Sequence, residues 1–404
     1  MGAEPSLRVF ILAGEASGDH LGGPLMAALR RQCPVRIDFF GVGGPTMAQN
    51  SLEPLFAIED LSVMGLVEIA PRLPLLARRL NACVAAIQAR RPDAIITIDA
   101  PDFAFRLGQR LKRRGVTAPH IHYVAPTVWA WRPGRARAIA QYLDHIMTLL
   151  PFEPPYFERE GLTASYVGHP VIERNQRSTE PSEAAFRDAY AIAPSAPLLA
   201  ILPGSRRAEL KRLLPDFVAA AEGLRDSAPG TTIVFPTFAH FVDEIADATA
   251  HWRQPPVIVT KSGDKAAALQ SARAAIAASG TVGLELAFHM VPHVVAYRVS
   301  PLTAFLARRL VRTRCVHLAN IILDEAAVPE LLQQDVSVPR LIAEAEALLA
   351  DGPARERQLK HFARLLTVMT LDGGARPSEK AAAAVLGILN LQECQAGGQY
   401  EADQ

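Results

Sequence analysis

Short apolar runs alternate with longer segments of helical period along most of the chain. Two such runs, LRVFILAG at residues 7–14 and PDAIITIDA at 92–100, are each followed by a stretch whose apolar positions recur every three or four residues. The alternation resumes with PLLAILPG at 197–204 and TTIVFPT at 231–237. This pattern is typical of parallel β-sheets covered by helices. It therefore predicts an α/β chain with two doubly wound sheets.

The segment 168–197 interrupts this periodicity and is rich in Pro and Ser, which favours an interdomain connection that contains one helix. From about residue 338 the pattern is purely helical, and the end of the chain is polar. We therefore expect an N-terminal domain over residues 1–172, a C-terminal domain over 173–370, and a final helix with a polar tail over 371–404.

Composition narrows the class of protein. The chain has 404 residues, of which 50% are hydrophobic. That is too many residues for one hydrophobic core and enough for two domains of ordinary size. The balance of 42 basic and 41 acidic residues does not indicate a nucleic-acid partner. No apolar run is long enough to span a membrane, and no signal peptide is recognised, so we expect a soluble or peripheral protein. The cysteines form no C-x-x-C pair, which fits a reducing cytoplasm; they are Cys33, Cys83, Cys315 and Cys394.

A glycine-rich loop, AGEASGDHLGG at 13–23, follows the first apolar run and leads into a predicted helix, whose N-terminus would attract an anion. The spacing of a P-loop is absent, and GVGG at 41–44 is only a fragment of a dinucleotide-binding fingerprint. A structural turn with Asp19 as a helix cap remains an equal alternative.

Two later loops suit phosphate groups. In LPGSRRAEL, Gly204 and Ser205 open the backbone and Arg206 offers a planar fork of donors. In ASGTVGLELAF, the break at 279–281 precedes a helix and could receive a diphosphate, while Glu285 could accept hydrogen bonds from ribose hydroxyls. The alternative for this second loop is a capping box.

A fourth loop, IDAPDF at 98–103, ends an apolar run in two carboxylates. Asp102 precedes a segment of helical period, so it is adequately explained as an N-cap. Asp99 has no such explanation. It lies at the end of a predicted buried strand, where open parallel sheets bind their ligands, and is therefore a candidate catalytic residue.

Metal chemistry is not expected. His120 and His122 would share one face of a strand, but no third ligand converges on them, and histidines of this kind are usually hydrogen-bonded core residues. No D-x-D motif occurs. Helix dipoles and arginine would then have to stabilise a departing diphosphate.

The segment 61–84, LSVMGLVEIAPRLPLLARRLNACV, is too apolar for a simple surface helix, yet its charges and prolines rule out a spanning one. An element lying in a membrane interface fits this composition, and a buried helix hairpin fits it equally well. On the first interpretation, the residues in contact with the membrane or with acyl chains would be Val63, Met64, Leu66, Val67, Leu73, Leu75 and Leu76.

Many ordered motifs resemble the lipid-A-disaccharide synthase family over residues 8–390. They include AGEASGD, GVGGPTM, LSVMGLVEI, IDAPDF, HYVAPTVWAWRPGR, YVGHPVIE, LPGSRRAE and ASGTVGLE. The resemblance implies a GT-B glycosyltransferase, in which two Rossmann-like domains face a cleft. It also implies an inverting reaction that joins UDP-2,3-diacylglucosamine to 2,3-diacylglucosamine 1-phosphate (lipid X) and releases UDP.

The resemblance further implies roles for single residues. Asp99 would be the general base, and no cofactor or metal would be needed. The implied substrate-binding residues are Glu15, Ser17, Gly18, Asp19, Gly204, Ser205, Arg206, Ser279, Gly280, Thr281, Glu285, Arg298 and Asn320. The sequence departs from the family's pattern around Asn320, at His317, Ala319 and Asp324. The implied partners are the two lipid substrates and the lipids of the cytoplasmic face of the inner membrane, with a homodimer left open.

Two other classes of function stay open at this point. A nucleotide-sugar epimerase of the same fold would share the nucleotide loops but would not need the apolar segment 61–84. A non-catalytic nucleotide- or lipid-binding module would not need Asp99.

Overall fold

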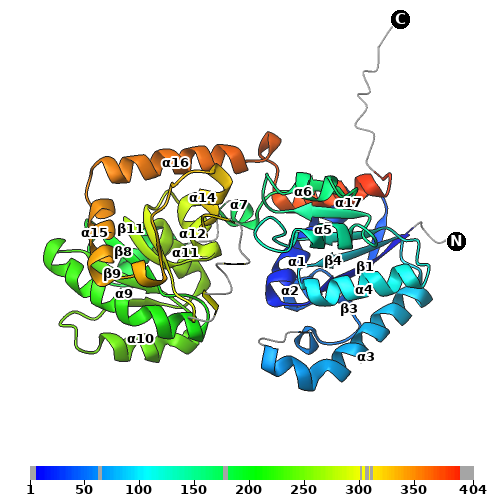
Figure 1. The fold of residues 1–404 in the computed structure, drawn as a ribbon, viewed down its shortest axis with the longest axis horizontal. Helices are drawn as coiled ribbons and strands as arrows, with labels where there is room; N and C mark the ends of the chain where they lie inside the picture. The colour runs from blue at the N-terminus through cyan, green and yellow to red at the C-terminus, as the bar shows by residue number, and fades with distance from the viewer. Residues whose placement is uncertain are drawn as a thin grey trace, which may run out of the picture. The chain divides into compact units, whose positions relative to one another are not determined.

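The computed structural model describes residues 6–61, 66–175, 181–300, 303, 304, 309 and 313–391, without the side chains of 66–71, 174 and 175. It divides into two compact units. Residues up to 170 form the first unit together with those from 371 onward, and residues 171–370 form the second. Each unit contains one sheet whose strand pairs are all parallel (Figure 1). The prediction of two parallel-sheet domains is thus confirmed.

The first unit has a seven-stranded sheet in the order β3-β2-β1-β4-β5-β6-β7. Its strands are β1 Ser6–Ala13, β2 Arg36–Val42, β3 Glu53–Pro54, β4 Ala94–Ile98, β5 His120–Tyr123, β6 His145–Thr148 and β7 Thr163–Tyr166. Its helices are α1 Ala16–Gln32, α2 Pro45–Gln49, α3 Leu66–Arg90, α4 Pro101–Arg113, α5 Gly134–Ile139, α6 Pro154–Glu158 and α17 Pro377–Ile388.

The second unit has a six-stranded sheet in the order β10-β9-β8-β11-β12-β13. Its strands are β8 Leu198–Leu202, β9 Thr232–Pro236, β10 Val257–Val259, β11 Ala274–Ala278, β12 His293–Tyr297 and β13 Glu330–Leu332. Its helices are α8 Glu183–Ala189, α9 Arg207–Ser227, α10 Val242–Thr249, α11 Ser262–Gln270, α12 Thr281–Phe288, α14 Leu318–Leu323, α15 Val338–Leu349 and α16 Pro353–Met369.

The central strands β8 and β11 of the second sheet are continuously apolar because both faces of this sheet are covered. In β8, Leu198 and Ala200 belong to one buried cluster, whereas Leu199 and Ile201 belong to another. Side chains alternate between the two faces of a strand, so the two clusters are the layers above and below the sheet. A strand that is buried on both sides leaves only its ends for polar chemistry.

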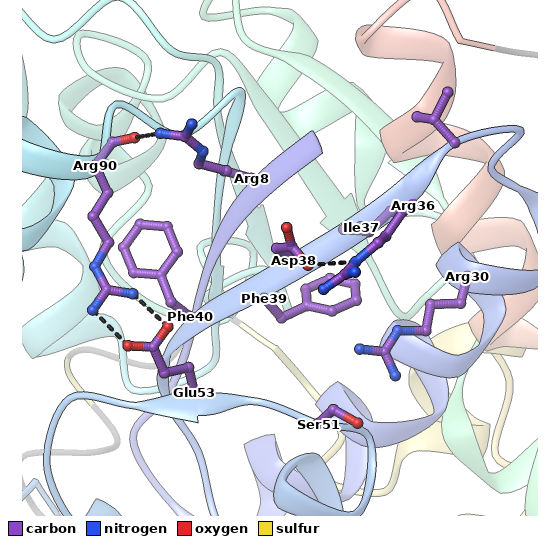
Figure 2. A pocket seen from close by; sticks show the side chains of 11 residues that line it. Arg8, Arg30, Arg36, Ile37, Asp38, Phe39, Phe40, Ser51, Glu53 and Arg90 are labelled. Atoms are coloured by element: carbon purple, nitrogen blue, oxygen red, sulfur yellow. Dashed lines mark hydrogen bonds and ion pairs between the residues drawn. The ribbon is translucent and has the colours of Figure 1, made fainter. Parts of the chain in front are cut away.

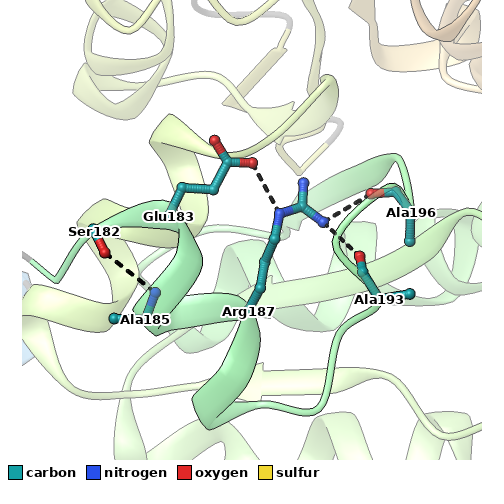
Figure 3. A network of polar contacts seen from close by, with 6 residues as sticks. All are labelled: Ser182, Glu183, Ala185, Arg187, Ala193 and Ala196. Carbon is teal, nitrogen blue, oxygen red and sulfur yellow. Dashed lines mark hydrogen bonds and ion pairs between the residues drawn. The ribbon is translucent and has the colours of Figure 1, made fainter.

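The connection between the units contains two short helices, α7 (Pro170–Asn175) and α8, where one was expected. Ser182 caps α8, and Arg187 ties this helix to the chain that leads into β8 (Figure 3). The Arg187 guanidinium donates to Glu183 at 2.8 Å and to the carbonyls of Ala193 and Ala196 at 3.1 and 2.9 Å. These contacts fix the entry to the first strand of the second sheet.

The last helix of the chain returns to the first unit. Helix α17 packs on α1, and Ala381, Ala382, Val385 and Leu386 are buried in the same apolar cluster as β1. The final helix is therefore part of the N-terminal core.

Candidate active site at the switch points of the two sheets

Each sheet has a point where the chain reverses the direction in which it adds strands. In the first unit the reversal lies between β1 and β4, and in the second it lies between β8 and β11. Ligands of open parallel sheets bind beyond the carboxyl ends of the two strands that flank such a point. The loops that follow these four strands are the glycine-rich loop, IDAPDF, LPGSRR and ASGTVG. Topology therefore brings the four loops singled out in the sequence to the two switch points.

In the first unit, the glycine-rich loop lies against the end of β4. The Ser17 hydroxyl donates to Asp99 Oδ2 at 3.1 Å, which joins the two loops directly. A Cβ on Gly14 would lie 2.4 Å from the Cβ of Ala100, so this close approach requires glycine. The candidate base and the glycine-rich loop thus form one site.

Asp99 and Ala100 both have left-handed backbone conformations, with φ of 52° and 45°. Asp99 N–H still donates to the Tyr123 carbonyl at 2.9 Å, so the sheet continues to this residue before the chain turns. Left-handed conformations outside glycine cost roughly 1–3 kcal/mol and concentrate at functional sites. The turn directs the chain out of the sheet at the residue that carries the carboxylate.

The expectation that Asp102 caps the following helix is wrong. The N-cap of α4 is Ala100, with Pro101 at the first helical position, so Asp102 lies inside the first turn. Its side chain is 91% exposed and pairs with Arg135 at 3.2 Å. The signal that could have located the helix start is Pro101, because proline is favoured at the first position of a helix.

Asp19 is a helix cap, although not of its own helix. Its carboxylate is buried and accepts three backbone N–H bonds, from Gly44 at 2.8 Å, Met47 at 2.9 Å and Thr46 at 2.9 Å. These groups lie at the start of α2. The structural alternative for this residue is thus supported, because its acceptor positions are occupied by the neighbouring loop.

In the second unit, the donors of the loop after β8 converge on one carboxylate. Gly204 has a φ of 117°, and the N–H groups of Ser205 and Arg206 donate to Glu209 Oε2 at 3.2 and 3.4 Å. The guanidinium of Arg206 pairs with the other oxygen of Glu209 at 3.3 Å, and its side chain is 74% exposed. Two backbone donors and a guanidinium are therefore already arranged around one carboxylate of the chain itself.

The loop after β11 leads directly into α12. Gly280 is the N-cap of this helix and makes no side-chain capping bond, so the capping-box alternative is wrong. Ser279 is half-buried and Thr281 is exposed. The start of α12 consequently presents backbone N–H groups and two hydroxyls beside the loop that holds Arg206, because β8 and β11 are neighbours.

Two other candidates are already engaged with protein groups. The Arg298 guanidinium donates to Asp216 at 2.5 Å and to the Val336 carbonyl at 2.8 Å. Asn320 is buried, and its amide nitrogen donates to the Val328 carbonyl and to Glu330 at 2.8 and 2.7 Å. Its oxygen accepts from Val328 N–H at 2.8 Å. Both side chains hold neighbouring segments in place, which favours a positioning role for each.

The two histidines considered as metal ligands face a threonine. Thr97 Oγ1 lies 3.1 Å from His120 Nε2 and 2.9 Å from His122 Nδ1. Burial lowers the pKa of His120 to about 4 and, with the neighbouring His120, that of His122 to about 3. Within the part of the chain that the structure describes, no group of three or more His, Cys, Asp or Glu residues is placed to hold a metal ion.

The segment after residue 65 forms one long helix, α3, so a helix hairpin is not present in the described part of the segment. Leu73 is 48% exposed, and Leu75 and Leu76 are half-buried. Val63 and Met64 lie outside the described residues, as do the side chains of Leu66 and Val67. None of the described helices is long and apolar enough to cross a membrane.

Comparison with known proteins decides the family. The family model for lipid-A-disaccharide synthetase matches residues 9–383. The lipid-A-disaccharide synthase of Rhodospirillum centenum is 48% identical over 383 residues, which cover 95% of each chain. The chain belongs to the lipid-A-disaccharide synthase family. It is therefore a glycosyltransferase.

Solved structures agree on the fold. The chain resembles MurG of Acinetobacter baumannii with a TM-score of 0.53 and 13% identity, covering 96% of this chain and 99% of that one. It also resembles UDP-GlcNAc 2-epimerase of Neisseria meningitidis with a TM-score of 0.59 and 10% identity, covering 96% and 100%. At these identities the likeness establishes the GT-B fold alone, with its two Rossmann-like domains.

The departure at His317 is accommodated locally in this member of the lipid-A-disaccharide synthase family. His317 Nδ1 accepts from Ala319 N–H at 3.1 Å, and its Nε2 lies 3.0 Å from His293 Nε2. Burial lowers the pKa of both rings, so a neutral pair shares one hydrogen bond. A Cβ on Gly283 of α12 would lie 2.3 Å from His317 Nε2, so the ring packs directly on this helix. The substituted side chain thus supports the helix whose start faces the Arg206 loop.

A buried carboxylate that sequence reasoning missed lies in the loop after β6, at the same edge of the sheet as the candidate base. Glu153 accepts from the Trp129 indole at 3.0 Å and from the N–H groups of Leu149 and Leu150 at 3.1 and 3.0 Å. Burial raises its pKa to about 7, although these three donors oppose the shift. The contact joins the loops that follow β5 and β6, at the sheet edge where Asp99 lies. No periodicity distinguishes this Glu from an exposed one, so only its place inside LPFEPPYFEREG at residues 150–161, another of the motifs that resemble the family, could have indicated it.

Proposed function

We propose that this chain condenses UDP-2,3-diacylglucosamine with 2,3-diacylglucosamine 1-phosphate to form lipid A disaccharide 1-phosphate and UDP, with Asp99 as the general base. The observation that carries the role of Asp99 is its position at the switch point of the first sheet, where Ser17 holds one of its oxygens at 3.1 Å. Family membership supports the substrates.

The chemistry requires one base. An α-linked donor that yields a β-linked product undergoes a single inverting displacement, in which the acceptor's primary hydroxyl attacks the anomeric carbon. That hydroxyl is too weak an acid to attack unassisted, so a carboxylate takes its proton as the new bond forms. Asp99 is placed at the end of a rigid buried strand, which suits a group that must be held in a fixed position.

The leaving UDP needs its negative charge stabilised. In the second unit, hydrogen-bond donors follow two adjacent strands. The loop after β8 supplies the N–H groups of Ser205 and Arg206 and the Arg206 guanidinium, and β11 leads to the N–H groups at the start of α12. In the structure Glu209 accepts from the N–H groups of Ser205 and Arg206 and from the Arg206 guanidinium, so we propose that the diphosphate displaces its carboxylate. Glu285, one turn into α12, would meet the ribose, and no metal takes part in this scheme.

Helix α3 would provide contact with the membrane surface or with the acyl chains. Leu73 is one of the few large apolar side chains exposed in the described residues, and Arg72 and Arg78 of the same helix are exposed cations that suit anionic headgroups. We accordingly place the enzyme at the cytoplasmic face of the inner membrane as a peripheral protein.

The decisive test is to incubate the purified chain with both lipid substrates and to identify the products by mass spectrometry. We expect lipid A disaccharide 1-phosphate and an equal amount of UDP. UDP released without disaccharide would indicate hydrolysis, and an isomerised UDP-sugar would indicate an epimerase; either result would overturn the proposal.

A further inference from the structure

The loop after β5 lies beside the candidate base and has no role in the chemistry proposed above. It spans residues 124–133, within the motif HYVAPTVWAWRPGR, and follows the strand next to β4 in the first sheet. Asp99 N–H donates to the carbonyl of Tyr123, the last residue of β5, at 2.9 Å. Beyond the loop, Arg135 of α5 pairs with Asp102 of α4 at 3.2 Å. The chain at both ends of the loop therefore contacts the segment that carries Asp99.

One tryptophan anchors this loop and another is left exposed. The Trp129 indole donates to Glu153 at 3.0 Å, and its ring packs edge-on against Phe152. Trp131, two residues later, is 37% exposed and is one of the few large apolar side chains exposed in the described residues. An exposed ring on an anchored loop presents a flat apolar face in a fixed position. Such a face suits the C–H surface of a sugar ring.

Arg132 lies directly on this exposed ring, with its guanidinium carbon 4.2 Å from the centroid of the Trp131 ring. Stacking on an aromatic face fixes the plane of a guanidinium and leaves the N–H groups at its rim free to donate. Arg132 is exposed, and among the described residues no carboxylate pairs with it, whereas Arg135 is paired. Its backbone is left-handed, with φ of 63°, a conformation that concentrates at functional sites when the residue is not glycine. The loop thus offers an unneutralised guanidinium beside an apolar surface.

The acceptor of the proposed reaction has both features that this pair can recognise. In 2,3-diacylglucosamine 1-phosphate the charged phosphate is attached to C1, and the attacking hydroxyl is on C6. C1 and C5, which carries C6, flank the oxygen of the sugar ring, so a cation that binds the phosphate must lie near the base. Guanidinium groups bind phosphate oxygens through paired, charge-assisted hydrogen bonds.

We propose that Arg132 binds the 1-phosphate of the acceptor and that Trp131 packs against the acceptor's sugar ring. This inference rests on the proposed function, and it names the residues that select a phosphorylated acceptor over a neutral one. The phosphate of a membrane lipid headgroup shares this chemistry. The acceptor is favoured because the chain on either side of the loop contacts the segment of Asp99.

The test compares 2,3-diacylglucosamine 1-phosphate with the neutral methyl glycoside of 2,3-diacylglucosamine as acceptors, in micelles of an uncharged detergent. The variants are Arg132→Gln and Arg132→Lys. Arg30→Gln is the matched control, because Arg30 is also exposed, lies 5.3 Å from the ring of Phe39 and has no carboxylate partner among the described residues. It lines a cavity of about 870 Å³ at the amino ends of β1 and β2, whereas Asp99 follows the carboxyl end of β4 (Figure 2).

We expect Arg132→Gln to lower kcat/KM for the phosphorylated acceptor by about tenfold or more, and to leave kcat/KM for the glycoside near that of wild type. Arg132→Lys keeps the charge without the planar fork and should recover part of the loss. Arg30→Gln should behave like wild type with both acceptors. An unchanged preference for the phosphate, as a contact with lipid headgroups alone would give, overturns the inference. An equal loss with both acceptors, as a folding defect would give, also overturns it.

Trp131→Ser removes the ring that packs on the sugar, so it should lower kcat/KM for both acceptors. Wild-type values for this variant would exclude Trp131 from the acceptor site. The inference and the proposed function fail differently. If wild type forms no disaccharide from the phosphorylated acceptor, the proposed function is wrong, and this inference with it. If disaccharide forms and Arg132→Gln keeps the wild-type preference, only the inference is wrong.

Discussion

Asp99 is held by two hydrogen bonds. Its N–H donates to the Tyr123 carbonyl, and its carboxylate accepts from the Ser17 hydroxyl. A side chain held in this way loses little freedom when substrate arrives, which is what a positioned base requires. Asp102, three residues later, is an exposed partner of Arg135. The two carboxylates of one short loop therefore have different environments and should respond differently to substitution.

We expect Asp99→Asn to lower kcat by about 10²–10⁴-fold, because it keeps the shape of the side chain and removes the base. UDP affinity and the circular dichroism spectrum should stay near those of wild type. Asp102→Asn should leave kcat and the free energy of unfolding nearly unchanged, because an exposed ion pair contributes little to stability. Steady-state kinetics of the two purified variants separates the roles, and an inactive Asp102→Asn beside an active Asp99→Asn would reverse the assignment.

Glu153 should make stability depend on pH. Burial raises its pKa from 4.5 to about 7, so the folded chain holds this proton more tightly than the unfolded chain does. Its contribution is full below about pH 4.5 and is lost as the pH rises through about 7. Relative to Glu153→Gln, wild type should thus lose about 2 to 3 kcal/mol of unfolding free energy between about pH 5 and pH 8. Urea unfolding measures the difference, with Glu160→Gln as an exposed control; a pH-independent difference would refute this explanation.

Single residues also mark the limit of what the sequence predicts. Asp19 was recognised as a cap candidate, yet the helix that it caps begins 26 residues later, at Pro45, and no local pattern links the two. Asn320 matches a family position, but its partners Val328 and Glu330 are brought to it by tertiary folding. Local signals predict which residues are polar and well placed, whereas the partner of each depends on packing.

At the level of elements, α3 combines an exposed Leu73 with a C-terminal half that packs into the core through Leu80, Cys83 and Ile87. We expect Leu73→Ser to reduce sedimentation with anionic vesicles and to leave the thermal midpoint nearly unchanged, because a side chain that is 48% exposed gives up little buried area. Val368→Ser, at a similarly exposed apolar position of α16, is the matched control. Reduced stability with unaltered vesicle binding would mean that the residue serves the fold.

The loop after β8 offers an equally sharp comparison, since two neighbouring arginines differ in their surroundings. Arg206 pairs with Glu209 at the loop, whereas Arg207 pairs with Glu244 at 2.7 Å. We expect Arg206→Ala to weaken UDP binding by about tenfold or more, because a charge-assisted bond to phosphate is lost. Arg207→Ala should bind UDP like wild type. Calorimetric titration distinguishes them, and equal affinities would exclude Arg206 from the UDP site.

For the whole molecule, the alternation of apolar runs and helical segments predicted both sheets because the central strands are buried on two faces. The strand Ala274–Ala278 and its neighbour Leu198–Leu202 show no polar position that could obscure the pattern. Edge strands are harder to predict from the sequence, since β3 has two residues and β13 three. Such short runs have no periodicity to detect. The candidate loops could be found because each follows a strand, but the pairing of these loops at the switch points depends on strand order.

Activity of the whole enzyme should survive excess EDTA, because guanidinium and backbone donors can offset the charge of the departing diphosphate without a cation. Product formation is measured by mass spectrometry before and after chelation, with added magnesium as the comparison. Turnover that stops with EDTA and returns with magnesium would show that a metal takes part.

The return of α17 to the first unit affects the order in which the chain can fold during synthesis. The second unit is continuous from residue 171 to 370 and is complete before the last helix has been made. The first unit lacks Ala381, Val385 and Leu386 from its core until the residues after 370 have been made. The usual N-to-C order of domain folding on the ribosome is therefore reversed for these two units. The N-terminal unit keeps part of its apolar surface exposed until a helix that is made after the whole second unit has packed on it.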